Sequence, residues 1–125
     1  MSGASTSNKA AVMLTTGLED AEKVTVALLT AVAAAEAGRP TLTFLAKEAV
    51  RLALRGHAAG VACDGCPPIA GLVERYAAAG GRFIACGVCF NAKQLDKAQL
   101  LGNAEVAGTV QLWEWIGEGA TTFSF

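Results

Sequence analysis

Short apolar runs alternate with longer segments of helical spacing along this chain of 125 residues. Runs such as AAVMLTT (10–16) and TLTFLA (41–46) are continuous and contain β-branched residues, a pattern typical of parallel strands buried on both faces. The segments between the runs have the period of helices. Strands are expected at residues 10–16, 41–46, 82–85 and 121–125. The alternation predicts a three-layer α/β sandwich with a mainly parallel sheet.

The ends of the helices are marked by acidic residues, proline and glycine. Acids occupy the first turn of the segment that stops at Gly38, while Pro67 and Pro68 open a later one. Asn103 is a suitable N-cap for the last helix. Helices are expected at residues 18–38, 47–56, 67–81 and 103–119, with shorter helical segments at 88–95 and 96–101. We expect a disordered lead at residues 1–8 and a single α/β domain at residues 9–125.

The charges of the chain are balanced and interspersed. Ten basic and eleven acidic residues give a net charge of −1, without a basic stripe that would indicate nucleic-acid binding. The longest nearly apolar run, residues 26–35, is about half the roughly 18–20 residues that a membrane span needs. The N-terminal MSGASTSNK lacks the apolar region of a secretory signal, so we expect a cytoplasmic protein without membrane contact.

Several polar or reactive residues follow the predicted strands directly. Parallel strands place their C-termini along one end of a sheet, and ligands bind there. Thr16 and Gly17 follow the first strand, Lys47 follows the second, and Cys86 follows the third. Thr16 and Gly17 offer a hydroxyl and backbone donors to an anion at a helix start. The same pattern also fits a plain strand-to-helix turn.

The four cysteines form two pairs with metal-ligand spacing. Cys63 and Cys66 are separated from Cys86 and Cys89 by nineteen residues, which matches the generic template of a four-cysteine zinc site. Zinc ribbons, however, present such pairs on β-hairpin turns, whereas here each pair follows an α/β element. In a reducing compartment, metal binding or thiol chemistry is favoured over a disulfide framework. Zinc is therefore a possible ligand, and no cofactor is required.

Thiol chemistry is expected to centre on Cys86. The residue lies where a strand ends and a short helix begins, so backbone N–H groups and the helix dipole favour a thiolate there. Lys93 adds a positive charge nearby. Such a thiolate suits a nucleophile that accepts sulfane sulfur or a peroxide oxygen, with Cys89 as a second carrier or resolving thiol. A structural alternative is that Cys63 and Cys89 only fill apolar space.

Three aromatic or imidazole side chains have less specific patterns. His57, the only histidine, lies in a glycine-flanked loop and is expected to be a solvent-exposed residue. Trp113 and Trp115 are two positions apart on a predicted helix, so they cannot both face one core. One of them is a candidate for a subunit contact or for a half-buried surface position.

The order of these segments resembles the DsrE/DsrF-like sulfur-relay family. The resemblance runs from about residue 9 to the end of the chain. Its segments are MLTTGLEDAEKVTVALLTAVAAAEAG, TLTFLAKEAVRLALRG, PPIAGLVERYAAAGGRFIACGVCFNAKQL and AEVAGTVQLWEWIGEGATTFSF. The resemblance implies a flavodoxin-like fold, a homotrimer or homohexamer, and sulfur-donor and sulfur-acceptor proteins as partners. In sulfur-transferring members a cysteine after the strand before the last long helix carries a persulfide, and Cys86 matches it.

Two features depart from the family pattern. Many relatives have a second cysteine, matched by Cys89, followed by an Ala-Arg-Gly-Leu-like run, whereas this chain has AKQL at 92–95. Lys93 thus replaces an arginine. The pair Cys63 and Cys66 is not a general feature of the family, which leaves zinc binding or a disulfide open.

The sequence therefore predicts a sulfur carrier or sulfurtransferase that holds a persulfide on Cys86. Two alternatives remain. One is a zinc protein that uses all four cysteines in a structural or regulatory site. The other is a thiol peroxidase or redox protein that cycles Cys86 through a sulfenic acid to a disulfide with Cys89.

Overall fold

The computed structural model of the chain describes residues 8–125, in which five strands form one sheet. The strands are β2 (Ala10–Leu14), β3 (Thr41–Leu45), β4 (Arg82–Cys86), β5 (Ala104–Ala107) and β6 (Thr121–Ser124). Their order is β5-β4-β3-β2-β6, and every neighbouring pair is parallel. The predicted α/β class with a parallel, flavodoxin-like sheet is confirmed. The lead predicted at residues 1–8 lies, apart from Asn8, outside the described residues.

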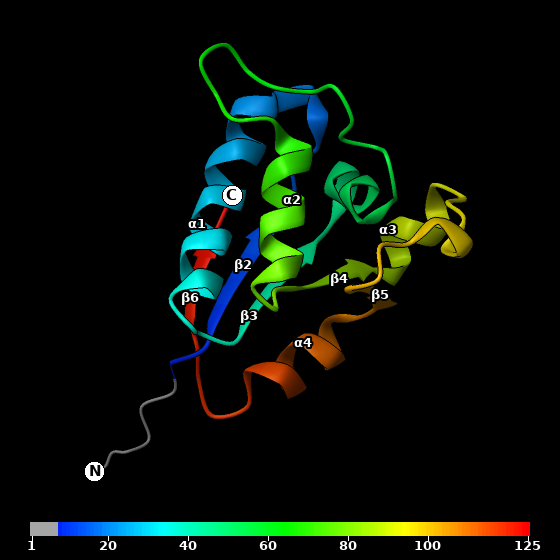
Figure 1. Cartoon of the computed structure of the whole chain (residues 1–125). Coiled ribbons are helices and arrows are strands. Elements are labelled where there is room, and N and C mark those ends of the chain that lie inside the picture. The colour runs from blue at the N-terminus through cyan, green and yellow to red at the C-terminus, as the bar shows by residue number, and fades with distance from the viewer. Residues whose placement is uncertain (1–7) are drawn as a thin grey trace.

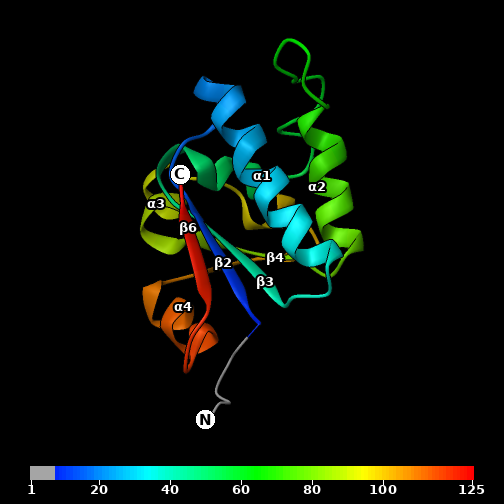
Figure 2. The ribbon, with the colours of Figure 1, turned by 90° about the vertical axis from the view of Figure 1, so that its left-hand side faces the viewer.

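Helices cover both faces of this sheet. The α-helices are α1 (Ala21–Glu36), α2 (Ile69–Ala78), α3 (Gly87–Ala92) and α4 (Thr109–Ile116), and the 3-10 helices are η1 (Leu18–Asp20), η2 (Lys47–Ala53) and η3 (Lys97–Gln99). Figures 1 and 2 show α1 and α2 side by side on one face and α4 on the other. Within residues 8–125, no helix combines the length and apolarity that crossing a membrane requires.

The two faces of the sheet bury unequal cores. The larger core lies between the sheet and the α1–α2 layer and includes the fully buried Leu14, Leu28 and Phe83. A smaller cluster on the opposite face is packed against Leu112 and Trp115 of α4. Successive strand residues point to opposite faces, so β3 contributes to both cores, and its whole length is buried.

The starts of the two helices α1 and α2 follow the sequence signals closely. The acidic start of the segment 18–38 forms η1, after which the Asp20 side chain caps α1 by accepting a hydrogen bond from the Lys23 N–H at 3.1 Å. Gly38 ends this region with a φ of 86°, a conformation that glycine adopts without steric cost. The helix predicted at 67–81 begins after Pro68, as α2.

The helix predicted at residues 103–119 is wrong in its first part. Ala104–Ala107 form β5, which pairs with β4 from Phe83 to Cys86, and α4 begins only at Thr109. Asn103 is not an N-cap, since its side-chain amide donates to the carbonyl of Gly81 at 2.8 Å. Hydrogen bonding to a neighbouring strand here overrides the helical propensity of the segment.

Tyr76 connects α2 to the sheet. Its ring is fully buried, and its hydroxyl donates to the carbonyl oxygen of Arg82 at 2.7 Å while accepting from the hydroxyl of Thr43 at 3.0 Å. A methyl group on Gly81 would overlap the Tyr76 ring. Glycine at this position therefore allows the chain to turn from α2 into β4 directly against the tyrosine.

Candidate functional site

Cys86 lies at the junction between β4 and α3. It is the last residue of the strand and the N-cap of the helix, with φ −55° and ψ 121°. Its half-buried side chain contacts both cores, because it lies where the sheet ends between the two layers. The position is the one expected from the sequence: a free thiol at the carboxyl end of the sheet, next to a helix start.

Cys89 lies one turn further along, within α3, and is also free and half-buried. Its Sγ accepts a hydrogen bond from the backbone N–H of Lys47 at 3.2 Å. Lys47 has a φ of 55°, and this uncommon backbone conformation occurs where the chain leaves β3 for η2. The structure thus directs a fixed donor at the second thiol of the pair.

Lys93, at the C-cap of α3, forms an ion pair with Glu48 of η2. Its Nζ lies 2.9 Å from Glu48 Oε2, while Arg51 Nε lies 2.9 Å from Glu48 Oε1. The hydrogen bond from Lys93, followed by that from Arg51, lowers the pKa of Glu48. Lys93, predicted to be an anion-binding residue, is therefore already paired with a carboxylate.

Gly17 packs against the same residue of η2. A methyl group added to Gly17 would lie 2.8 Å from the backbone oxygen of Glu48, so only a glycine fits this approach. Thr16 is half-buried beside it, in the segment between β2 and η1. The neighbouring Thr15 is held by its hydroxyl, which donates to the carbonyl of Phe125 at 3.2 Å. Gly17 and Lys93 thus meet at Glu48.

The sequence suggested that His57 is exposed to solvent, whereas in the structure it is half-buried. Burial, followed by the positive charge of Arg51, lowers the pKa of His57, and the charge of Glu48 opposes this shift. The imidazole is therefore neutral at neutral pH.

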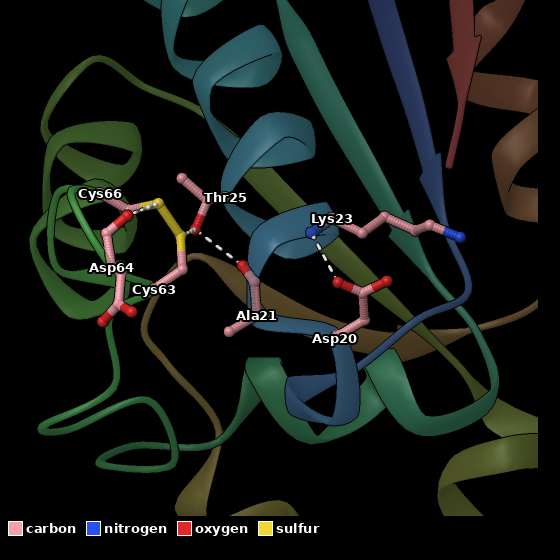
Figure 3. Close-up of a disulfide and its surroundings, with 7 residues drawn as sticks. All are labelled: Asp20, Ala21, Lys23, Thr25, Cys63, Asp64 and Cys66. Atoms are coloured by element: carbon pink, nitrogen blue, oxygen red, sulfur yellow. Dashed lines mark hydrogen bonds between the residues drawn. A yellow bond between two sulfur atoms is a disulfide. The ribbon is translucent and has the colours of Figure 1, made fainter.

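Cys63 and Cys66 form a disulfide in the loop before α2 (Figure 3). The loop packs on the first turns of α1, where Thr25 Oγ1 lies 3.7 Å from Cys63 Sγ. Among residues 8–125, no group of three or more His, Cys, Asp or Glu side chains is placed to hold a metal ion. A zinc site made of Cys63, Cys66, Cys86 and Cys89 stays a prediction, and it requires this disulfide to be reduced.

Sequence reasoning did not identify the contacts made by η2. Glu48 and the N–H of Lys47 both touch α3, and their positions directly after the strand at 41–46 were the available signal. Parallel strands bring such residues to the same end of the sheet. The backbone turn at Lys47, which aims its N–H at sulfur, has no comparable signature in the sequence.

The fold and the site define a class: a parallel α/β protein with two free cysteines where a strand meets a helix at the carboxyl end of its sheet. The model of the DsrE/DsrF-like family matches residues 8–125, and the chain belongs to this family.

Solved structures share this fold at low sequence identity. The ychN protein from E. coli is 21% identical, with a TM-score of 0.78 over 94% of this chain and 98% of that chain. The protein of unknown function MTH1491 from Methanobacterium thermoautotrophicum is 18% identical, with a TM-score of 0.68 over 94% and 98% of the two chains. BT1422 from Bacteroides thetaiotaomicron, also of unknown function, is 15% identical, with a TM-score of 0.64 over 94% and 96%. A search of curated proteins gave no match.

Proposed function

We propose that the chain is a sulfur carrier that holds a persulfide on Cys86 and transfers the sulfur to a partner thiol. The observation that carries this proposal is the position of Cys86, a free, half-buried thiol at the N-cap of α3. Membership of the DsrE/DsrF-like family supports a role of the sulfur-relay type. Fold alone does not define a function, so the proposal depends on the thiols themselves.

The transfer consists of two displacements at sulfur. The Cys86 thiolate attacks the terminal sulfur of a donor persulfide, the donor S–S bond breaks, and the donor leaves as a thiolate. Cys86 then carries the sulfur as Cys–S–SH, which ionises readily. An acceptor thiolate attacks this outer sulfur, the new S–S bond breaks, and the Cys86 thiolate is restored. No electrons are gained or lost overall, so the cycle needs a donor and an acceptor and no separate oxidant.

The remaining site residues position the second thiol. Two contacts tie η2 to α3: the Lys47 N–H on Cys89 Sγ and the ion pair of Lys93 with Glu48. Cys89 thereby lies fixed one helical turn from the carrier thiol, where it shields or resolves the persulfide. Gly17 and Thr16 complete this end of the sheet and are proposed to contact the anionic persulfide through the hydroxyl and backbone donors.

Intact mass measurement tests the carrier function. We expect the reduced protein to gain a single sulfur atom when it is incubated with glutathione persulfide, and to lose it when a small acceptor thiol is added. Cys86→Ser should abolish the increment, whereas Cys89→Ser should retain it. The proposal is wrong if the wild-type protein gains no sulfur, or if the increment survives in Cys86→Ser.

We also propose that the chain self-associates as a trimer or hexamer through the outer side of α4. Trp113 is 71% exposed and Val110 is 63% exposed, whereas Trp115 packs on the smaller core. Large exposed aromatic side chains are enriched at protein interfaces. The prediction that the two tryptophans face different environments is in agreement with these exposures.

A further inference from the structure

We propose that Cys63 and Cys66 form a second, reversible redox site that exchanges with dithiol reductants, separate from the two free cysteines at Cys86 and Cys89. The chemical class of its substrate is a dithiol, either a small molecule or a protein with a paired cysteine motif. The proposal depends on the geometry of the loop before α2 and does not depend on persulfide transfer.

The loop holds the two sulfurs together through its backbone. The N–H of Cys66 donates to the carbonyl of Cys63 at 2.9 Å, and Gly65 supplies the φ of 75° that this turn requires. Pro67 and Pro68 then restrict the chain up to the start of α2. The backbone of this turn, and not the S–S bond alone, brings the two cysteines together.

Each sulfur also has an acceptor ready for the thiol form. Cys66 Sγ lies 3.7 Å from the carbonyl oxygen of Asp64, and Cys63 Sγ lies 3.7 Å from the hydroxyl oxygen of Thr25 (Figure 3). A disulfide sulfur has no hydrogen to donate, so these two contacts become hydrogen bonds only after reduction. The loop therefore offers each thiol an acceptor, and reduction needs the two side chains to move only as far as separates their sulfurs.

Thr25 makes the reduced state compatible with α1. Its hydroxyl donates to the carbonyl of Ala21 at 2.8 Å, and its side chain is only 3% exposed. This donation uses the single hydroxyl hydrogen and leaves the oxygen lone pairs free to accept from a Cys63 thiol. Oxidation removes that donor without leaving the Thr25 hydrogen unpaired.

The same contact distinguishes the two sulfurs during exchange. Cys63 Sγ lies 3.7 Å from the hydroxyl of the buried Thr25 of α1, whereas Cys66 Sγ lies 3.7 Å from the carbonyl of Asp64 in its own loop, and both cysteines are half-buried. A thiolate of the dithiol attacks Cys66, the Cys63–Cys66 bond breaks, and Cys63 leaves as a thiolate that takes up a proton. The second thiol of the reductant then attacks the mixed disulfide and releases Cys66. Two electrons pass to the protein, and the dithiol becomes a disulfide.

The experiment is a redox titration of the folded protein. Protein carrying Cys86→Ser and Cys89→Ser is equilibrated in buffers of reduced and oxidised dithiothreitol, alkylated, and weighed intact, with circular dichroism recorded on the same samples. We expect one transition from no alkyl groups to two, with unchanged helical signal. Resistance of the pair to reduction until urea unfolds the chain, or loss of the fold in the reduced protein, would overturn the proposal.

Variants of α1 test the thiol contact itself. Thr25→Val removes the acceptor for Cys63, and we expect the equilibrium to move toward the disulfide by roughly two- to tenfold, the range of one hydrogen bond. Thr25→Ser should restore the wild-type position. Thr30→Val is the matched control, because the Thr30 hydroxyl donates to Val26 in the same way at 2.9 Å without touching a sulfur. Equal shifts in Thr25→Val and Thr30→Val would contradict the assigned role of Thr25.

Discussion

Gly17 shows how one residue holds the site together. Its φ of −100° is accessible to any residue, so glycine is needed there for space and not for backbone conformation. The space is taken by the backbone oxygen of Glu48, which approaches where a side chain would begin. The loop after β2 therefore contacts η2 directly, and η2 in turn contacts α3.

We predict that Gly17→Ala destabilises the protein by about 1–3 kcal/mol, because the added methyl group must displace backbone atoms. Urea denaturation measures the free energy of unfolding. Gly71→Ala is the control, since nothing lies within 4 Å of a methyl group at that position in α2. There alanine should stabilise the helix by about 0.5–1 kcal/mol. Similar effects of the two variants would show that Gly17 is not sterically confined.

A second residue-scale prediction concerns the acid dependence of stability. Because the pKa of Glu48 is lowered in the folded state, its ion pairs contribute stability above the ordinary pKa of a carboxyl group. This contribution disappears as the pH falls through the lowered pKa. The difference in melting temperature between wild type and Glu48→Gln should therefore be present at neutral pH and vanish in strong acid.

Thermal melts at a series of pH values check this expectation. Glu118→Gln is a suitable control, because Glu118 makes no ion pair with another described residue and should show no such trend. A difference between wild type and Glu48→Gln that stays constant down to strong acid would contradict the assigned role of the carboxylate.

At the scale of elements, one buried hydroxyl links α2 to the sheet by hydrogen bonds. We predict that Tyr76→Phe destabilises the protein by about 1–3 kcal/mol, because it leaves the buried hydroxyl of Thr43 without its acceptor. Burial raises the pKa of Tyr76 to about 12, so the hydroxyl stays protonated and the effect should not change between neutral and mildly alkaline pH.

A double-mutant cycle with Thr43→Val separates this contact from the rest of the core. Removing both hydroxyls leaves no unpaired donor at that position, so the double variant should lose less stability than the sum of the two single variants. Urea denaturation provides all four values. Additive losses would mean that the two hydroxyls act independently.

Two of the strands that the sequence predicted well are buried along almost their whole length. The runs at 10–16 and 41–46 became β2 and β3, which lie in the interior of the sheet and are covered on both sides. The run at 104–107 is only half-buried, lies at an edge of the sheet, and has a single β-branched residue in Val106. Its strand state depends on pairing with β4, which a local pattern cannot reveal.

The candidate site was predictable to the same limited extent. The position of Cys86 could be predicted because it directly follows the predicted strand at 82–85, and such a residue lies at the carboxyl end of the sheet. The partners of Cys89 and Lys93 depend on η2 forming a 3-10 helix instead of the expected α-helix at 47–56. The 3-10 conformation sets the directions of the Lys47 N–H and the Glu48 carboxylate. Helical periodicity in the sequence does not distinguish it from an α-helix.

At the scale of the whole molecule, the exposed outer side of α4 has a consequence for self-association that can be measured. We predict that Trp113→Glu lowers the molar mass in sedimentation equilibrium, because it places a charge in the proposed contact over α4. Leu29→Glu is the control, since Leu29 is 42% exposed on α1, in the opposite layer. A monomeric wild-type protein, or a Trp113→Glu variant with the wild-type mass, would refute self-association through α4.

The pairing of β6 with β2 has a consequence for the order in which the molecule is completed. Ala10 lies opposite Thr121, so β2 acquires its second neighbour from a strand that is synthesised after the other four described strands of the sheet. Residues 10–107 contain the other four strands and α3, including β5, whose Ala107 pairs with Cys86. These segments are synthesised before β6, and the hydrogen bond from the Thr15 hydroxyl to the carbonyl of Phe125 forms only after β6 has been synthesised. The strands around the two thiols are therefore synthesised before β6, which completes the far edge of the sheet and is separated from β4 by β3 and β2.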